Sequence, residues 1–327
     1  MRDIDQFPRL SLAHLPTPLQ ELPGISALTG KHLYIKRDDM TGVALGGNKV
    51  RKLEFLLADA VAQGCDTILT TGGAQSNHAM LTAACCNQLG LRCILVLKQR
   101  GETGKKGNLL LDDLLGAQVR FVDADSYDAV YAEMDAICAD LAAQGRKGYQ
   151  IPVGGSVPLG CLGYALCVRE FTRQAAGLGV RFDDVVCAAG SGGTLAGLIL
   201  GARLFAPHTR VTGLAVDDDD FAAIAAGLVN DAAALLDAPV RIAPAEVPLR
   251  NCCGAGYAIP SAAGVAAIRT LAQREGLILD PVYTGKAFAG LLDLCREGYF
   301  DGRENILFLH SGGAGGLFAL DLDHPVG

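Results

Sequence analysis

The chain has 327 residues, 50% of them hydrophobic, which is enough to build two domains or one large α/β unit around a substantial core. Its formal net charge is −7 at pH 7 and it has no basic tract, which excludes the charge pattern of a nucleic-acid-binding protein. No apolar run approaches the roughly 20 residues that span a bilayer, and residues 1–10 lack the apolar stretch of a signal peptide, so we expect a cytoplasmic protein without a membrane partner.

The cysteines number eleven, an odd count, and none lies in a C-x-x-C pair of the kind found in zinc or thioredoxin-like sites. Free cysteine usually behaves as a small buried hydrophobe. We therefore predict thiols in the core, a reducing compartment and no metal site.

Short aliphatic runs alternate with helical patterns along most of the chain. A first series predicts strands at 66–72, 92–98, 117–123 and 148–154, with helices at 76–89, 105–116 and 127–144 between them. A second series predicts strands at 183–190, 210–216 and 305–313. Because parallel strands need crossover helices, the alternation favours an α/β fold with two doubly wound domains and mostly parallel sheets. The best boundary is the segment 152–164, which is rich in glycine and proline.

The segment 45–55, LGGNKVRKLEF, puts three cations, Lys49, Arg51 and Lys52, at the predicted start of a helix. Helix N-termini carry partial positive charge and favour anions, so cations there are unfavourable unless an anion offsets them. The segment therefore indicates a bound anion or an unusually reactive amine.

The segment 70–81, TTGGAQSNHAML, offers a hydroxyl, an amide and an imidazole at the next helix start, from Ser76, Asn77 and His78. One alternative is that the serine or the asparagine is simply a helix N-cap and that the histidine is an ordinary surface or core residue with its hydrogen bonds satisfied. Three consecutive polar residues on a glycine-flanked turn favour a site for a small carboxylate.

The segment 187–198, CAAGSGGTLAGL, lies between an expected strand and an expected helix. Its small residues are Gly190, Ser191, Gly192, Gly193 and Thr194. Main-chain N–H groups of such a loop converge on an anion and the helix dipole assists, so we predict a phosphate cradle. A glycine-rich turn without a ligand is one alternative. A NAD-dependent oxidoreductase is another, with Asp217 on the ribose, although Leu195 stands where the third glycine of that fingerprint belongs.

Two more junctions carry polar residues. The segment 277–291, LILDPVYTGKAFAGL, presents Tyr283 and Thr284, and the segment 309–318, LHSGGAGGLF, presents Ser311. A tyrosine can simply pack and a serine can simply cap a helix. Four polar junctions in one chain favour a shared site at the carboxyl ends of the strands.

Six stretches together resemble one known family in sequence order, from about residue 6 to residue 318. The family comprises the pyridoxal-phosphate enzymes grouped as D-cysteine desulfhydrase, 1-aminocyclopropane-1-carboxylate deaminase and L-cysteate sulfo-lyase, which have the tryptophan-synthase-β fold, called fold type II. The stretches are GGNKVRKLEF, GGAQSNHA, IPVGGSVPLGCLGY, GSGGTLAGL, LDPVYTGKA and LHSGGAGGLF.

The resemblance implies pyridoxal 5'-phosphate as cofactor, a small amino-acid substrate and a homodimer. It also implies a large cofactor-binding domain, residues 1–48 and 161–327, and a small α/β domain, residues 49–160. A cofactor-binding regulatory protein without turnover is a further alternative, which the complete set of loops disfavours.

By the same resemblance, Lys49 holds the cofactor covalently and moves the substrate's Cα proton, while Lys52 meets the cofactor phosphate with the 190–194 cradle. Neighbouring cations, Arg51 and Lys52, should favour the neutral amine of Lys49. The remaining implied roles are Asn77 at the pyridine 3'-oxygen, Ser76 at the substrate carboxylate and in proton transfer, Tyr283 packed on the cofactor, Ser311 near the pyridine nitrogen, and substrate contacts from Ser76, Asn77, His78, Gly155 and Thr284.

The substrate is harder to predict than the reaction, which should be an α,β-elimination. Thr284 stands where cyclopropane-opening relatives resemble one another in a glutamate, so ring opening is disfavoured. Met80 replaces an arginine common among relatives, and the run 217–220 is four aspartates, so a sulfonate lacks an evident cation. An alternative for the acidic run is a solvated loop without a function, at the start of a helix whose dipole favours carboxylates. We rank D-cysteine first, L-cysteate second and the cyclopropane amino acid third.

Overall fold

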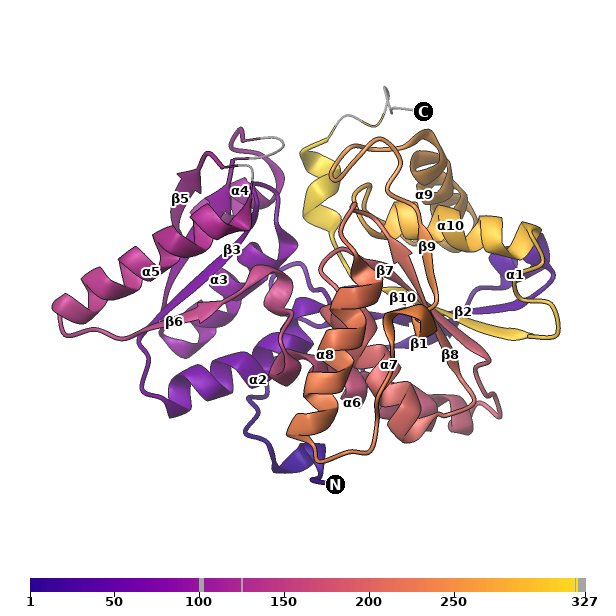
Figure 1. The fold of residues 1–327 in the computed structure, drawn as a ribbon. Coiled ribbons are helices and arrows are strands. Elements are labelled where there is room, and N and C mark those ends of the chain that lie inside the picture. The colour runs from indigo at the N-terminus through magenta and orange to yellow at the C-terminus, as the bar shows by residue number, and fades with distance from the viewer. Residues whose placement is uncertain (100–102, 125, 321, 323–327) are drawn as a thin grey trace.

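The computed structural model describes residues 1–99, 103–124, 126–320 and 322. Two sheets with helices on their faces make up the molecule (Figure 1). The strands are β1 (Leu19–Glu21), β2 (His32–Arg37), β3 (Thr67–Gly73), β4 (Arg92–Lys98), β5 (Gln118–Val122), β6 (Gly148–Ile151), β7 (Asp184–Ala189), β8 (Arg210–Ala215), β9 (Leu249–Asn251) and β10 (Asn305–His310). The helices are α1 (Pro23–Thr29), α2 (Lys49–Ala62), α3 (Asn77–Leu89), α4 (Gly107–Leu114), α5 (Tyr127–Ala143), α6 (Pro158–Gly177), α7 (Gly193–Phe205), α8 (Phe221–Leu235), α9 (Ala262–Glu275) and α10 (Thr284–Arg296), with short 3₁₀ turns η1 (Ile4–Gln6), η2 (Asp38–Met40), η3 (Val153–Gly155), η4 (Pro244–Glu246) and η5 (Ala314–Phe318).

The four-stranded sheet has the order β5-β4-β3-β6 and is parallel throughout. Its central strand β3 is buried along its whole length, because helices cover both faces. Ile68 faces α2 and α3, whereas Leu69 faces α5. The four strands and three helices predicted for this part are confirmed to within three residues at each end.

The six-stranded sheet has the order β1-β2-β10-β7-β8-β9 and is parallel except for the pair β1–β2. Alternate residues of β10 serve the two faces: Leu307 and Leu309 pack with α6, α7 and α8, while Ile306 and Phe308 pack with α1, α9 and α10. The prediction of two α/β units with mostly parallel sheets is confirmed. The sequence pattern did not predict β1, β2 or β9, since β1 and β9 have only three residues each and β2 carries charged residues at its end.

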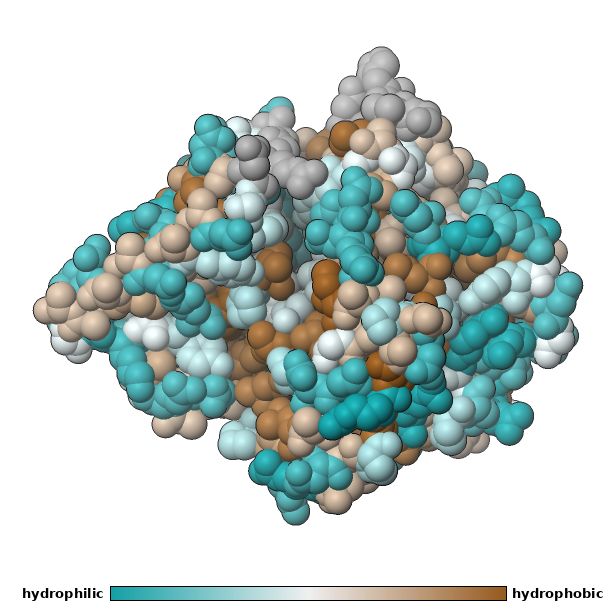
Figure 2. All heavy atoms as spheres, in the orientation of Figure 1, coloured by the Kyte–Doolittle hydropathy of each residue, from teal (hydrophilic) through white to brown (hydrophobic). Residues whose placement is uncertain are grey.

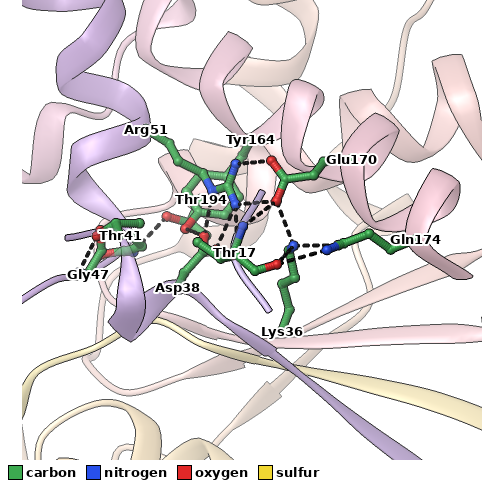
Figure 3. A network of polar contacts seen from close by, with 11 residues as sticks. Thr17, Lys36, Asp38, Thr41, Gly47, Arg51, Tyr164, Glu170, Gln174 and Thr194 are labelled. Atoms are coloured by element: carbon green, nitrogen blue, oxygen red, sulfur yellow. Dashed lines mark hydrogen bonds and ion pairs between the residues drawn. The ribbon is translucent and has the colours of Figure 1, made fainter. Parts of the chain in front are cut away.

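A buried polar network ties α2 to the six-stranded sheet (Figure 3). The guanidinium of Arg51 donates to both carboxylate oxygens of Asp38, at 2.8 Å each, and to both of Glu170, at 2.9 Å. Tyr164 donates to Asp38 at 2.6 Å and Lys36 donates to Glu170 at 2.6 Å. The expectation that Arg51 acts on the amine of Lys49 is therefore wrong, because two carboxylates already pair with its charge.

Helix α2 packs against α3, which covers the four-stranded sheet, and against α6, which covers the six-stranded sheet. The division at residues 48/49 and 160/161 stays a proposal, since α2 belongs to neither side alone. In the described part of the chain, no helix is long and apolar enough to cross a membrane.

Candidate active site

A cavity of about 280 Å³ lies where the carboxyl ends of the two sheets face each other. Figure 2 shows the surface hollowed along this seam, with hydrophobic residues beside it. The four-stranded side contributes the loop after β3 and the end of β4, and the six-stranded side contributes the loops after β7 and β10. Predicted site residues in the wall are Lys49, Ser76, Asn77, His78, Gly190, Ser191, Gly192, Thr194, Tyr283 and Ser311.

Lys49 is the first residue of α2, and its amine donates to Oδ1 of Asn48 at 3.2 Å. The loop before it is pinned to the opposite side, because the Asn48 N–H donates to the Ser311 carbonyl at 3.0 Å and the Asn48 amide donates to Thr194 Oγ1 at 3.0 Å. Burial, with the nearby charge of Lys52, holds the pKa of Lys49 well below its ordinary value, although Asp280 acts against this shift. A neutral amine is both nucleophile and proton acceptor, as the predicted role requires.

Lys52 is one turn further along α2, behind the cavity wall, and is 0% exposed. Its ammonium donates to the Gly154 carbonyl at 3.1 Å, and among the described residues no carboxylate pairs with it. Burial lowers its pKa from 10.5 to about 8. Such a charge needs an anion nearby.

The loop after β7 supplies the rest of the anion cradle. The Gly193 N–H donates to Ser156 Oγ at 3.2 Å, and that hydroxyl donates to Ser191 Oγ at 3.0 Å. A Cβ on Gly193 would lie 2.7 Å from Lys52 Nζ, so only glycine lets the start of α7 approach the lysine. The helix N-terminus, the hydroxyls and the ammonium together fit a phosphate group. Ser156 was not predicted: its segment was interpreted as a domain boundary and as part of the family resemblance, with only Gly155 assigned a role.

Asn77 presents its amide N–H group to the cavity, and Asn108 explains why. The Nδ2 of Asn108 donates to the Gln75 carbonyl at 2.9 Å, which fixes the orientation of that amide, and also donates to Asn77 Oδ1 at 2.7 Å. Asn77 Nδ2 is then left as the donor for a ligand. Ser76 caps α3 by accepting from the Ala79 N–H at 3.2 Å, so its hydroxyl proton is available to an anion.

His78 is buried in the cavity wall as the neutral Nε2–H tautomer. Thr70 Oγ1 lies 2.8 Å from His78 Nε2 and donates its own proton to the Ile151 carbonyl at 2.8 Å, so the imidazole must be the donor in the first pair. Burial, with Lys49 and Lys52 nearby, keeps the pKa of His78 well below its usual value. His78 therefore offers a hydrogen-bond acceptor at Nδ1 rather than a charge.

The structure does not bring Thr284 or Gly155 into the cavity wall. The Thr284 hydroxyl donates its only proton to Asp280 Oδ2 at 2.5 Å and accepts from the Asp280 N–H at 2.8 Å, and the residue is 0% exposed, so it has no proton to donate to a substrate. A Cβ on Gly155 would face Leu56 and His78 instead of the cavity. Asp280 also accepts from the Tyr283 N–H at 2.7 Å, which sets the start of α10.

Tyr283 lines the cavity, and its hydroxyl shares a hydrogen bond with that of Tyr257, whose ring is 5.9 Å away between centroids. Sequence reasoning missed Tyr257, and the only available signal was its position in a glycine-flanked stretch, GAGYAIP. Burial raises the pKa of Tyr283 well above its ordinary value, so the hydroxyl stays protonated.

The acidic run 217–220 divides between two roles. Asp217 and Asp219 line the cavity, whereas Asp220 caps α8 by accepting from the Ala223 N–H at 3.0 Å. Asp217, Asp218 and Cys253 have potential ligand atoms within 4.8 Å of one another. The ammonium of Lys286 already lies beside this cluster, donating to the Cys253 carbonyl at 2.6 Å.

Comparisons with known proteins agree with this geometry. Residues 10–312 match the family model described as pyridoxal-phosphate dependent enzyme. The chain is 45% identical over 317 residues to a putative 1-aminocyclopropane-1-carboxylate deaminase of Pyrococcus horikoshii, covering 96% of this chain and 94% of that one. It is 43% identical over 335 residues to D-cysteine desulfhydrase of Klebsiella pneumoniae, covering 99% of both.

A crystal structure described as a 1-aminocyclopropane-1-carboxylate deaminase homologue superposes with a TM-score of 0.90 at 43% identity, covering 96% of this chain and 94% of that one. The dinucleotide alternative for the 190–194 loop is therefore overturned, and the fold is that of fold type II. The anion cradle, the lowered pKa of the Lys49 amine and these matches lead to one conclusion: the chain belongs to the pyridoxal-phosphate dependent enzymes, in the group with relatives named as 1-aminocyclopropane-1-carboxylate deaminase and D-cysteine desulfhydrase.

Proposed function

We propose that the enzyme eliminates the β-substituent of a small amino acid, with D-cysteine and water giving pyruvate, hydrogen sulfide and ammonia. The observation that carries the proposal is the position of Lys49, whose amine, with its pKa lowered by burial and by Lys52, lines the same cavity as the anion cradle and the polar start of α3. Bound pyridoxal phosphate supplies an electron sink for the Cα–H bond that is broken.

The residues of the chain divide the remaining work. Lys52, Ser191 and Thr194 hold the phosphate, and Lys49 Nζ accepts the Cα proton. Ser76 Oγ and Asn77 Nδ2 bind the substrate carboxylate and the cofactor oxygen at the N-terminus of α3, where the helix dipole favours negative charge. Ser311 lies in the wall opposite, where it offers the pyridine nitrogen a neutral partner.

The environment of Thr284 argues against ring opening of the cyclopropane amino acid, although relatives carry that name. Its hydroxyl is held by Asp280, and it brings no carboxylic acid to the cofactor. A glutamate at this position could keep the pyridine nitrogen protonated and strengthen the electron sink, whereas threonine cannot.

L-Cysteate is the second candidate, and one observation favours it. Lys98, the last residue of β4, lies in the cavity wall, is only 7% exposed and has its ammonium 5.3 Å from the centroid of the Tyr127 ring. Its Cα pairs in register with that of Gly73, at the start of the loop that carries Ser76. Lys98 is thus a cation suited to a sulfonate, and the sequence alone did not predict a cation at this place.

Steady-state rates with D-cysteine, L-cysteine, L-cysteate, D-serine and the cyclopropane amino acid test the proposal, with pyruvate or 2-oxobutyrate as the readout. We expect the highest kcat/KM for D-cysteine. Sulfite release from L-cysteate that exceeds sulfide release from D-cysteine tenfold would reverse the ranking. Absence of turnover with all five would reject the elimination and leave the regulatory alternative.

A homodimer in the cytoplasm is the remaining part of the proposal. All eleven cysteines are free thiols, which suits a reducing compartment. Sedimentation measures the oligomeric state directly, and a monomer at micromolar concentration would contradict this part.

A further inference from the structure

The side chain of Lys286, the third residue of α10, is 1% exposed, yet its ammonium has no carboxylate within ion-pair distance among the described residues. It donates instead to two main-chain carbonyls, that of Cys253 at 2.6 Å and that of Gly256 at 2.8 Å. Burial lowers the pKa of Lys286, while the Cys253 thiol and the carboxylates of Asp217, Asp218 and Asp280 act to raise it. The Lys286 ammonium is therefore bound by two carbonyl oxygens and has several carboxylates nearby.

The two carbonyls belong to the segment that connects β9 to α9. Residues 252–260 connect β9 to α9 without a helix or strand of their own. Three of their backbone φ angles are positive, 66° at Gly254, 142° at Gly256 and 61° at Ala258, and the last is unfavourable for a residue with a Cβ. The Cys252 N–H donates to the Ala215 carbonyl at 2.7 Å and the Cys253 N–H to Asn251 Oδ1 at 2.8 Å, which hold the start of the segment, and the two carbonyls that converge on one ammonium hold the part up to Gly256.

Tyr257 directly follows Gly256, whose carbonyl accepts one of the two hydrogen bonds from Lys286, so the position of Tyr257 depends on this contact. Its hydroxyl meets the hydroxyl of Tyr283 in the cavity wall. Tyr283 caps the N-terminus of α10, three residues before Lys286. The start of α10 therefore positions Tyr283 by direct covalent connection and Tyr257 by the hydrogen bond from the Lys286 ammonium to Gly256.

We infer that Lys286 is a positioning residue whose ammonium serves as a built-in monovalent cation, ordering residues 252–260 so that Tyr257 reaches the active site. The inference rests on the proposed function only in that Tyr257 lines the site of that reaction. Main-chain carbonyls bind a potassium or ammonium ion through the same oxygen dipoles, so a small cation can replace the lysine nitrogen where space is available.

Two substitutions separate the charge of Lys286 from its volume. Lys286→Met keeps the length and fills the space without a charge, whereas Lys286→Ala leaves room for a small cation. The matched control is Lys147→Met, because that exposed lysine also donates to a main-chain carbonyl, that of Gln63 at 2.8 Å, outside the residues that line the cavity.

Each protein, loaded with pyridoxal phosphate, is assayed with D-cysteine in potassium, ammonium or choline chloride at equal ionic strength. We expect kcat to fall at least tenfold in both Lys286 variants, with the absorbance of the bound cofactor retained. Potassium or ammonium should restore Lys286→Ala at least threefold over choline and should leave Lys286→Met, Lys147→Met and the unchanged enzyme unaffected. If Lys286→Met retains the unchanged kcat, or Lys286→Ala does not respond to either ion, the inference is overturned.

Hydrogen exchange of the peptide 252–260 is the second measurement and needs no turnover. We expect faster exchange in both variants and a return toward slow exchange only for Lys286→Ala in potassium or ammonium. If the unchanged enzyme turns over none of the amino acids, the proposed function fails while this measurement still decides the inference. If the alanine variant folds only in potassium, dialysis into choline should release the same peptide, and exchange that stays slow would contradict the inference.

Discussion

Replacing Lys52 by methionine should make the cofactor-free protein more stable towards unfolding. The same replacement should weaken the binding of pyridoxal phosphate. Burial lowers the pKa of Lys52 from 10.5 to about 8. At about 1.4 kcal/mol per unit, this difference means that charging the buried ammonium costs about 3 kcal/mol without an anion. Methionine has a similar length and carries no charge, so Lys52→Met should gain up to about 3 kcal/mol of unfolding free energy at pH 7.

The difference in unfolding free energy between the two cofactor-free proteins should depend on pH in a definite direction. Between pH 8 and 10.5 the unfolded chain holds a proton on Lys52 that the folded protein has released, so this group makes the cofactor-free protein more stable as the pH rises. The advantage of Lys52→Met should therefore be fully present below pH 8 and shrink toward pH 10.5.

Cofactor binding should reverse the order of the two proteins. The phosphate forms charge-assisted hydrogen bonds with the ammonium, worth about 1.5 to 3 kcal/mol, so Lys52→Met should bind pyridoxal phosphate about 10- to 150-fold more weakly. Urea unfolding of the cofactor-free proteins and absorbance titration with the cofactor measure the two effects. Lys36→Met is the contrasting control, because Lys36 is buried but donates to Glu170 and Thr17, so its loss should destabilise both forms. Equal stability and equal cofactor affinity in the unchanged protein and Lys52→Met would refute the reasoning.

Three further predictions concern other described residues. Lys49→Ala should fold but lose turnover and the borohydride-reducible cofactor absorbance, because the nucleophile and proton acceptor are gone, and retained activity would reject the assignment. Asn108→Asp should lower kcat/KM about tenfold while leaving cofactor affinity within a few-fold, because an aspartate oxygen repels the Gln75 carbonyl and frees Asn77 to turn; an unchanged kcat/KM would argue against this orientation. Asp112→Asn should stabilise the protein at pH 8 by up to about 4 kcal/mol, since burial raises the pKa of the unpartnered Asp112 carboxyl from 3.8 to about 7. Between about pH 4 and pH 7 the folded state holds a proton that the unfolded chain has lost, so the gain should shrink as urea unfolding is repeated from pH 8 toward pH 5, and a pH-independent difference would contradict it.

The alternation of short aliphatic runs with helical patterns predicted the sheets, because a parallel strand covered on both faces is buried and mostly free of charge along its length, as β3 and β10 are. The polar junctions predicted the place of the site for a related reason. Loops at the carboxyl ends of parallel strands meet at one edge of a sheet, so Gly190 and Ser311 had to lie at that edge of one sheet and Ser76 at the same kind of edge of the other.

Side-chain partners distant in sequence could be decided only by the tertiary structure. Arg51 and Lys52 are adjacent cations in the sequence, but one turns to Asp38 and Glu170 and the other to the anion cradle, because successive helix positions point about 100° apart.

The same limit applies to the residues that support the site from other elements. The roles of Asn108, Tyr257 and Lys286 could not be predicted from the local sequence, since what they do depends on contacts with loops up to 33 residues away along the chain. The sequence by itself determined the fold class, the cofactor chemistry and the loops that meet at the cavity. The packing of the two sheets decided which side chains reach that cavity, because direction and burial are properties of the folded chain and not of the local pattern.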